Sequence, residues 1–304
     1  MNKLTKVGLT ALASTMVVAS ANAADWSISG GASISYTNVS TDSGVNPYSF
    51  GDSLTFSASG DLDGGMSIST SMELDGNTMD DRKIAISSDT MGTVSITSSL
   101  TAGGIGRIGD VVPTASEEVY DVTDADDNGL ASTGVSSTNQ IGWVSNSFGG
   151  LTASVGHTSL AKESDTSWTL EYDASDMVDG LSLGYGMADN GTTSENETLY
   201  VKYTMGGLTV AYQDSTVNYD AAGTSDEDAT HVGASFAVNE NLSISVGRQD
   251  VEMGGAAEEE SSGVSASYTM GSMTVSGFSN KTDNTAGASG TNNSSAGVTV
   301  SFSF

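Results

Sequence analysis

The chain of 304 residues contains no cysteine and two prolines, and its 9 Lys and Arg are far outnumbered by 38 Asp and Glu. The absence of cysteine excludes a disulfide framework and any thiolate metal site. The formal net charge of −29 repels phosphate, so we expect no nucleic acid as a partner and no anion as cargo.

Long apolar runs are also scarce. Two lysines precede a short apolar stretch that ends at Ala21-Asn22-Ala23. This pattern is typical of a secretory signal peptide with an A-x-A cleavage site, so we predict that residues 1–23 are removed. No later stretch approaches the roughly 18 consecutive apolar residues that a spanning helix requires. If the mature chain, residues 24–304, lies in a membrane, we expect it to do so as a β-barrel.

The hydrophobic content of 37% is low for a globular chain, for which about 45–50% is usual. Two interpretations are compatible with this value: a disordered chain, or a barrel whose polar face is solvated. A disordered chain would show no apolar period. The period is present along nearly the whole sequence, which favours the barrel.

Apolar residues alternate with Ser, Thr or Gly in sixteen segments. Such alternation places an apolar set of side chains on one face of a strand and a small polar set on the other. The last segment ends on Phe304, and an apolar terminal strand invites aggregation unless another strand closes on it. The predicted strands centre on residues 26–36, 50–58, 66–74, 84–86, 94–96, 141–143, 151–155, 168–172, 181–185, 199–203, 208–212, 232–238, 242–246, 264–268, 273–275 and 296–304.

The connections alternate between short turns and long polar loops. The predicted short turns are 61–65, 89–92, 147–150, 176–180, 205–207, 239–241 and 270–272. The predicted long loops include 39–49, 214–229, 249–261 and 280–295. Short periplasmic turns and long outer loops are typical of an outer-membrane barrel, and sixteen antiparallel strands enclose an aqueous channel. We therefore predict an all-β transmembrane barrel whose Ser and Thr face lines water.

Two alternatives place the same strands elsewhere. In a soluble barrel or sandwich the apolar residues would point inward, but a barrel of this size has more interior volume than Val, Ile and Ala side chains fill. The other alternative is a secreted or surface-anchored β-rich adhesin or solenoid without channel activity. Repeats of fixed period would support it, and none is evident.

Several features together carry a family resemblance: the cleavable signal, Ala24-Asp25-Trp26 at the start of the first strand, sixteen alternating strands, a long segment after the fifth, and the terminal Phe304. The chain resembles the general diffusion porins of the Gram-negative outer membrane over its whole mature length. The resemblance implies a homotrimer of sixteen-stranded barrels whose third long loop folds into the pore. It also implies that the outer-membrane insertion machinery reads the C-terminal strand.

By order and length, residues 101–138 are the counterpart of that third loop. Carboxylates in a narrow channel with low-dielectric walls concentrate cations and repel anions, whereas an acidic surface loop would have no role in selection. On the resemblance we favour the constriction. The residues expected there are Glu117, Glu118, Asp121 and Asp124.

The family usually places arginines on the wall opposite this loop, and here the pattern departs. The inward positions of the first two strands carry no base. The pore-facing bases that we expect are Lys83, Arg107 in the loop and Lys202 on a later strand. Without arginines on the wall opposite the acidic loop, a strong electric field across the pore is in doubt. The departure therefore favours a preference for cations.

One segment of the loop resembles the start of a calcium site. Residues 124–129 match the D-x-D-x-N-G opening of an EF-hand, but the twelfth position is Val135 where a bidentate Glu belongs. A full EF-hand is therefore excluded. Calcium held by a looser cluster is an open hypothesis beside a solvated acidic loop, and its ligands would be Asp121, Asp124, Asp126 and Asn128.

The sequence indicates no enzyme. Of its two histidines, His157 has outward parity and His231 has lumen parity, and neither shows a Ser/His/Asp pattern. We predict a passive, cation-preferring diffusion channel in the Gram-negative outer membrane, reached by export through the periplasm. Its expected partners are outer-membrane lipid, lipopolysaccharide, the insertion machinery and two further copies of the chain.

Overall fold

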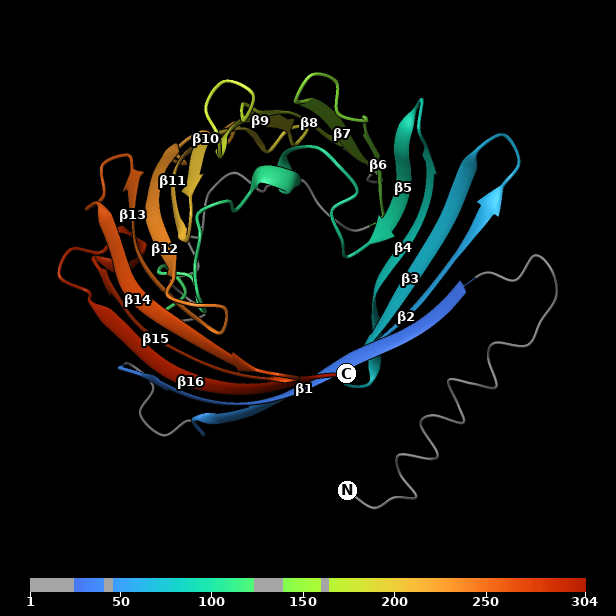
Figure 1. The fold of residues 1–304 in the computed structure, drawn as a ribbon. Coiled ribbons are helices and arrows are strands. Elements are labelled where there is room, and N and C mark those ends of the chain that lie inside the picture. The colour runs from blue at the N-terminus through green and yellow to red at the C-terminus, as the bar shows by residue number, and fades with distance from the viewer. Residues whose placement is uncertain (1–24, 41–45, 123–138, 160–163) are drawn as a thin grey trace, which may run out of the picture.

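Sixteen antiparallel strands close into a barrel, which confirms the predicted fold (Figure 1). The structure is a computed structural model that describes residues 25–40, 46–122, 139–159 and 164–304. The strands are β1 (Asp25–Val39), β2 (Tyr48–Leu62), β3 (Met66–Asp75), β4 (Thr78–Ser88), β5 (Gly92–Ser98), β6 (Gln140–Val144), β7 (Leu151–Ser159), β8 (Ser164–Asp173), β9 (Leu181–Asp189), β10 (Ser194–Met205), β11 (Leu208–Tyr219), β12 (Glu227–Ala237), β13 (Leu242–Met253), β14 (Glu259–Met270), β15 (Met273–Asp283) and β16 (Asn293–Ser303).

Helical structure in the described ranges is confined to two short 3-10 helices, η1 (Ile105–Ile108) and η2 (Thr285–Gly287). Over these same ranges, neither helix has the length and apolar content required to cross a bilayer.

The barrel is closed by the two ends of the chain. β1 pairs with β16, from Gly31 opposite Ser303 to Val39 opposite Ser295. On its other side β1 pairs with β2. Gly30 and Phe304 extend this ladder, since each amide N–H donates to the other residue's carbonyl, at 3.0 and 2.9 Å. A Cβ on Gly30 would lie 2.8 Å from the Phe304 ring, so the missing side chain makes room for the terminal aromatic residue.

The apolar face points out of the barrel, as the alternation predicted. Ile96 and Val298 are at least half exposed although they lie in the middle of paired strands. So large an apolar surface on a closed barrel fits contact with lipid. The opposite face carries small polar residues. Ser301 of β16, for example, pairs with Thr274 of β15, and residues paired across antiparallel strands share a face.

Several strands continue beyond the limits predicted from the apolar period. β11 reaches Tyr219 and β12 starts at Glu227, inside the segment 214–229 that was predicted as loop. The same is true of 249–261 and 280–295, where the connections shrink to 254–258 and 284–292. The backbone ladder continues where side chains no longer face hydrocarbon, so hydrogen bonding rather than the apolar period sets the strand ends.

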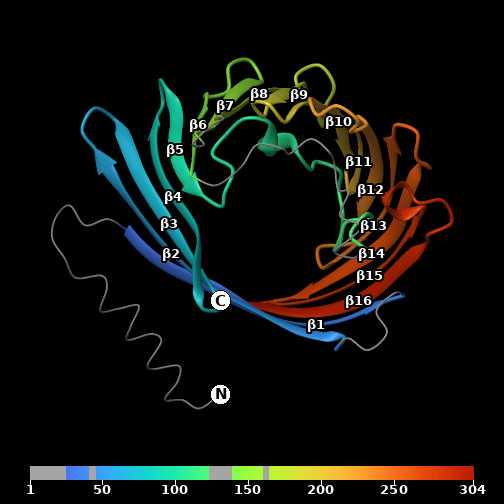
Figure 2. The same ribbon diagram turned by 180° about the vertical axis from the view of Figure 1, so that it is seen from behind.

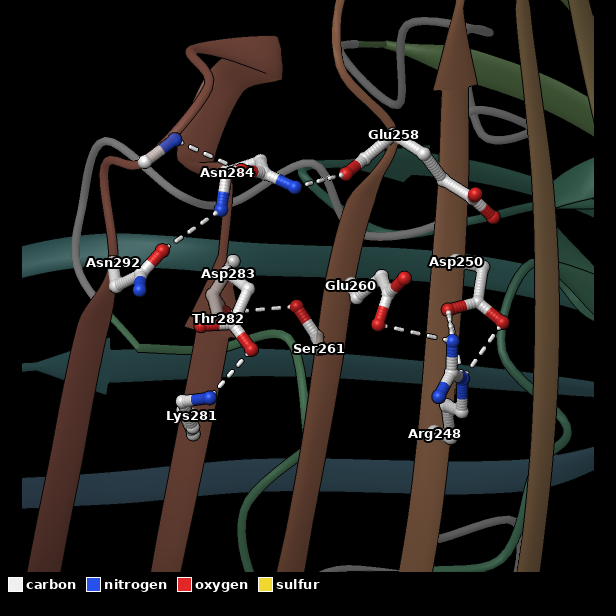
Figure 3. Close-up of polar contacts among 11 residues, drawn as sticks. Arg248, Asp250, Glu258, Glu260, Ser261, Lys281, Thr282, Asp283, Asn284 and Asn292 are labelled. Atoms are coloured by element: carbon white, nitrogen blue, oxygen red, sulfur yellow. Dashed lines mark hydrogen bonds and ion pairs between the residues drawn. The ribbon is translucent and has the colours of Figure 1, made fainter.

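Outward positions on these extensions carry charges instead of apolar side chains (Figure 3). Arg248 of β13 forms ion pairs with Asp250 at 2.8 Å and with Glu260 of β14 at 3.2 Å. Lys281 of β15 pairs with Asp283 at 2.5 Å. These solvent-exposed pairs stabilise the fold by little, about 0–1 kcal/mol each. They mark the level at which the outer surface becomes polar.

Candidate functional site

The described part of the connection between β5 and β6 folds into the barrel and lies along its wall, as predicted for the third loop (Figures 1 and 2). The connection comprises residues 99–139, slightly more than the predicted 101–138, and residues 99–122 and 139 are described. Figure 1 shows it leaving β5, passing through η1 and curving along the inner side of the strands on the β6 to β14 side. The inner faces of β1 to β4 and of β16 are left uncovered by the described part of the loop.

Wall side chains hold the first part of the loop through its backbone. The Gln140 side-chain oxygen accepts hydrogen bonds from Ala102 N at 2.6 Å and from Gly103 N at 3.2 Å. Further along the loop, the Ser154 hydroxyl accepts from Gly104 N at 2.7 Å. The loop amides are thereby satisfied away from bulk water, as buried backbone groups require.

The second part of the loop is held by amide side chains of more distant strands. Gln213 of β11 donates to the carbonyls of Ile108 and Gly109, both at 2.9 Å, and accepts from Val111 N at 3.2 Å. Asn280 of β15 donates to the Glu118 carbonyl at 2.5 Å. Because Gln213 and Asn280 contact the loop, their strand faces are the faces that point into the barrel.

A small hydrophobic cluster fixes η1 against the wall. Ile105 and Ile108 are completely buried, and they pack with Ala188 of β9 and Tyr200 of β10. Burial of each isoleucine side chain contributes about 1.5–3 kcal/mol. The amphipathic pattern of the strands did not predict this cluster, because Ala188 and Tyr200 occupy the polar, lumen-facing side of their strands.

Inward-facing glycines leave room for the loop. A Cβ on Gly142 of β6 would lie 2.4 Å from the Ala102 carbonyl, and one on Gly156 of β7 would lie 2.4 Å from the Gly103 oxygen. On β12, a Cβ on Gly233 would lie 2.5 Å from Val112. Real Cβ atoms do not approach this closely, so the loop lies in a groove lined by glycine. Glycine at lumen parity in strands that otherwise use Ser and Thr was a readable signal that sequence reasoning missed.

The structure places the predicted constriction residues at the far end of the described loop. Glu117 and Glu118 are half-buried and Asp121 is exposed, whereas Asp124 lies outside the described residues. Burial, followed by the neighbouring Asp121, raises the pKa of Glu117 to about 7. Burial, followed by the neighbouring Asp110, raises the pKa of Glu118 to about 8. Both carboxyls therefore carry only part of their charge at neutral pH.

Glu118 also belongs to a cluster that the sequence did not indicate. Oxygens of Asp110 and Glu118 and a ring nitrogen of His231 lie within 4.8 Å of one another. Burial raises the pKa of Asp110 as well. His231, on β12, is buried beneath the loop, and Tyr120 packs edge-on against its ring at 5.6 Å. The lumen parity of His231 was predicted correctly, but its neighbours come from a distant part of the chain.

The predicted bases come from three different elements, η1, β10 and β4. Arg107 of η1 donates to Glu171 of β8 at 2.8 Å, so its charge is offset by a partner. Lys202 of β10 faces the lumen beside Tyr200, its ammonium 5.9 Å from the ring centre. Lys83 of β4 is on the uncovered wall, in a cavity lined mainly by serines.

The uncovered wall also carries carboxylates. Thr55 and Ser53 of β2 face the lumen, and they pair with Glu73 and Asp75 of β3. Both acids line a cavity on this wall together with hydroxyl side chains of β1, β15 and β16. The wall on which the family resemblance implied arginines is therefore polar and partly acidic here.

The predicted calcium ligands Asp124, Asp126 and Asn128 lie outside the described residues, as do residues 1–23 of the predicted signal peptide. Both interpretations stay predictions. Asp121 is described and exposed, and its N–H donates to the Glu118 carbonyl at 3.3 Å.

Comparison with known families identifies the chain. A model of the Gram-negative porin family matches residues 8–304. The chain belongs to the Gram-negative porin family. This porin is therefore assigned to the outer membrane of a Gram-negative bacterium, in agreement with its closed barrel. No match was found among curated proteins.

Solved structures share the fold of this porin at low identity. OmpT, an outer membrane protein of Vibrio cholerae, superposes with a TM-score of 0.70 at 10% identity, covering 95% of this chain and all (100%) of OmpT. A trimer form of the same protein gives 0.67 at 11% identity, with 93% and 100% covered. A mutant of the Rh. blastica porin gives 0.64 at 15% identity, with 92% and 100% covered.

Proposed function

We propose that this porin is a passive, water-filled channel for small hydrophilic solutes and ions, and that it prefers cations. The observation that carries the proposal is the distribution of charge on the two sides of the lumen. Glu117, Glu118 and Asp121 lie on the loop, while Glu73 and Asp75 line the wall that the described part of the loop leaves uncovered. Acidic groups that line both sides of a channel concentrate cations in it.

The bases near the lumen counter this field only in part. Arg107 is paired with Glu171, and Lys83 and Lys202 lie on separate strands, β4 and β10. A transverse field needs opposite charges gathered on opposite sides. Here both sides carry acidic residues. The preference for cations therefore follows from the net negative charge of the lumen rather than from an electric field across the pore.

The reversal potential across a planar bilayer under a KCl gradient tests the proposal. We expect a sign that reports K⁺ permeating faster than Cl⁻. The variant Glu73→Gln/Asp75→Asn should move the potential toward that of a non-selective pore. The matched control is Glu252→Gln, which removes a charge from an exposed position on the outward face of β13. Chloride selectivity of the unmodified porin would refute the preference for cations.

The rival interpretation, a β-rich adhesin or solenoid without channel activity, predicts no conductance from folded protein. Heating before gel electrophoresis shows whether the barrel is folded, because a closed barrel migrates differently once it is unfolded. Folded protein that inserts into the bilayer and passes no current would favour the rival.

We further propose that the porin is a homotrimer and has no enzymatic activity. A trimer form of the structurally similar OmpT of Vibrio cholerae supports the first proposal. Chemical crosslinking in native membranes should give a ladder that ends at the trimer. The absence of a nucleophile-and-base pattern in the sequence supports the second.

The remaining proposals concern export and assembly. We propose that residues 1–23 direct export to the periplasm and that the insertion machinery binds the C-terminal strand. The barrel would then contact lipid along its apolar face and lipopolysaccharide along the charged outer extensions. Deletion of Phe304, whose backbone and ring contact Gly30, should lower the yield of inserted barrel.

A further inference from the structure

The cluster of Asp110, Glu118 and His231 brings together three metal-ligating side chains from two separate elements. Asp110 and Glu118 come from the loop and His231 comes from β12, and one ligating atom of each lies within 4.8 Å of the others. A zinc ion with bonds of 2.0–2.2 Å in tetrahedral geometry spaces its ligand atoms about 3.3–3.6 Å apart. Side-chain rotations that move the ligating atoms by about an ångström would therefore bring the three groups into coordination distance.

His231 supplies the observation that distinguishes this cluster from an ordinary group of acids. Only 1% of the residue is exposed, and its Nδ1 has no hydrogen-bond partner in the described structure. Buried polar atoms without a partner are rare and call for an explanation such as an ion or a water. A metal ion bound by a ring nitrogen would fix the tautomer and the orientation of the imidazole.

Tyr120 supports the same geometry from the side. Its ring packs edge-on against His231 at 5.6 Å, and its hydroxyl donates to an Asp110 carboxylate oxygen at 3.5 Å. In metal sites, contacts from neighbouring side chains orient the residues that coordinate the metal ion. Tyr120 therefore restrains two of the three groups.

We infer that Asp110, Glu118 and His231 form a binding site for a divalent transition-metal ion of the Zn²⁺ type. One imidazole with two carboxylates suits Zn²⁺, whereas Ca²⁺ and Mg²⁺ favour all-oxygen sites. Water would complete the coordination, because the loop side of the cluster is not fully buried. The site is distinct from the calcium cluster considered for Asp121, Asp124, Asp126 and Asn128.

Metal binding at this position would act on the channel in two ways. The ion would join the loop to β12 and so restrain the loop at Asp110 and Glu118. It would also offset the negative charge of two carboxyls near the predicted constriction. This second effect rests on the proposed function, whereas binding itself does not.

Equilibrium dialysis of the folded, detergent-solubilised porin against Zn²⁺ tests the site. We expect about one tightly bound Zn²⁺ per chain that excess Ca²⁺ does not displace. His231→Gln should weaken this binding by roughly tenfold or more, and Glu118→Gln should do the same if the histidine variant fails to fold. The matched control is His157→Gln, because His157 lies on the outward side of β7, where its ring bonds Thr166 at 2.9 Å. Gel migration before and after heating verifies that each variant is folded.

Equal Zn²⁺ affinity in His231→Gln and the unmodified porin would overturn the site, as would loss of binding in His157→Gln alone. A bilayer measurement then separates the two proposals. Micromolar Zn²⁺ should lower the K⁺ to Cl⁻ permeability ratio of the unmodified porin and leave that of His231→Gln unchanged. Zn²⁺ binding without any cation preference would refute the proposed preference for cations and leave the site standing. Preserved cation preference without Zn²⁺ binding would refute the site alone.

Discussion

Two glutamates on the loop show how burial alters the chemistry of a single side chain. Glu117 and Glu118 are half-buried beside other carboxyls, and this raises their pKa values to about 7 and about 8. A carboxyl in such a position is neutral below its pKa and negative above it. At neutral pH the negative charge of these two carboxyls is therefore incomplete.

We predict that cation preference increases with pH. Between pH 6 and pH 9 both glutamates lose their protons, so the loop gains negative charge and the K⁺ to Cl⁻ permeability ratio should rise. Reversal potentials measured across this range, in buffer with a metal chelator, check the sign. The double variant Glu117→Gln/Glu118→Gln should flatten the profile over the same range. A ratio that falls as pH rises would contradict the assignment of these groups to the pore.

At the scale of the element, the inner loop depends on the wall beneath it. Its backbone follows a groove where Gly142, Gly156 and Gly233 lack side chains. Gln140 and Gln213 then hold its peptide groups at distances of 2.6–3.2 Å. The loop therefore keeps a defined path through the barrel although η1 is its one described helical segment.

Filling the groove should displace the loop toward the lumen. In Gly142→Ala and in Gly156→Ala the new methyl group would lie 2.4 Å from loop backbone atoms, an overlap whose relief typically costs about 1–3 kcal/mol. We expect a lower single-channel conductance for each variant, because a displaced loop narrows the open side of the channel.

Gly51→Ala on β2 is the matched control for these variants. It adds the same methyl group to the uncovered wall, where the neighbouring atom is the Ser33 hydroxyl at the end of a movable side chain. Its conductance should stay at the unmodified value. If all three substitutions changed conductance equally, the groove would not explain the position of the loop.

At the scale of the whole molecule, the orientation of the two strand faces decides whether the barrel holds water or a packed core. Hydroxyl residues of β15 and β16 share the face of Ser245, which accepts a hydrogen bond from loop residue Ala115 at 2.9 Å. The polar face is therefore inside. The outward residues, such as Val300, would contact hydrocarbon.

Cysteine labelling tests this orientation without background, because the chain contains no native cysteine. In porin inserted in membranes, Ser301→Cys should react with a strongly hydrated maleimide, whereas Val300→Cys should react slowly or not at all. The two positions are adjacent in β16, so each serves as the control for the other. The reverse pattern of labelling would invert the barrel and exclude an aqueous channel.

Much of the fold could be predicted because strand alternation is a local property. Each of the sixteen segments centred on residues such as 26–36 or 296–304 coincides with a strand. The ends of the strands were predicted less accurately. The strands Glu227–Ala237 and Glu259–Met270, for example, begin in acidic stretches that show no apolar period. The long segment after β5 was correctly expected inside the pore, on resemblance rather than on any local pattern.

By itself, the sequence determined the barrel, its strand number and the face that points outward, because side chains two residues apart must share a face of a strand. Only the tertiary structure brought Asp110 and Glu118 to His231, and Arg107 to Glu171. These pairs are separated by many residues, so their proximity depends on how the loop crosses the closed barrel. The same long-range packing buries Glu117 and Glu118 and raises their pKa values, which no local pattern of residues encodes.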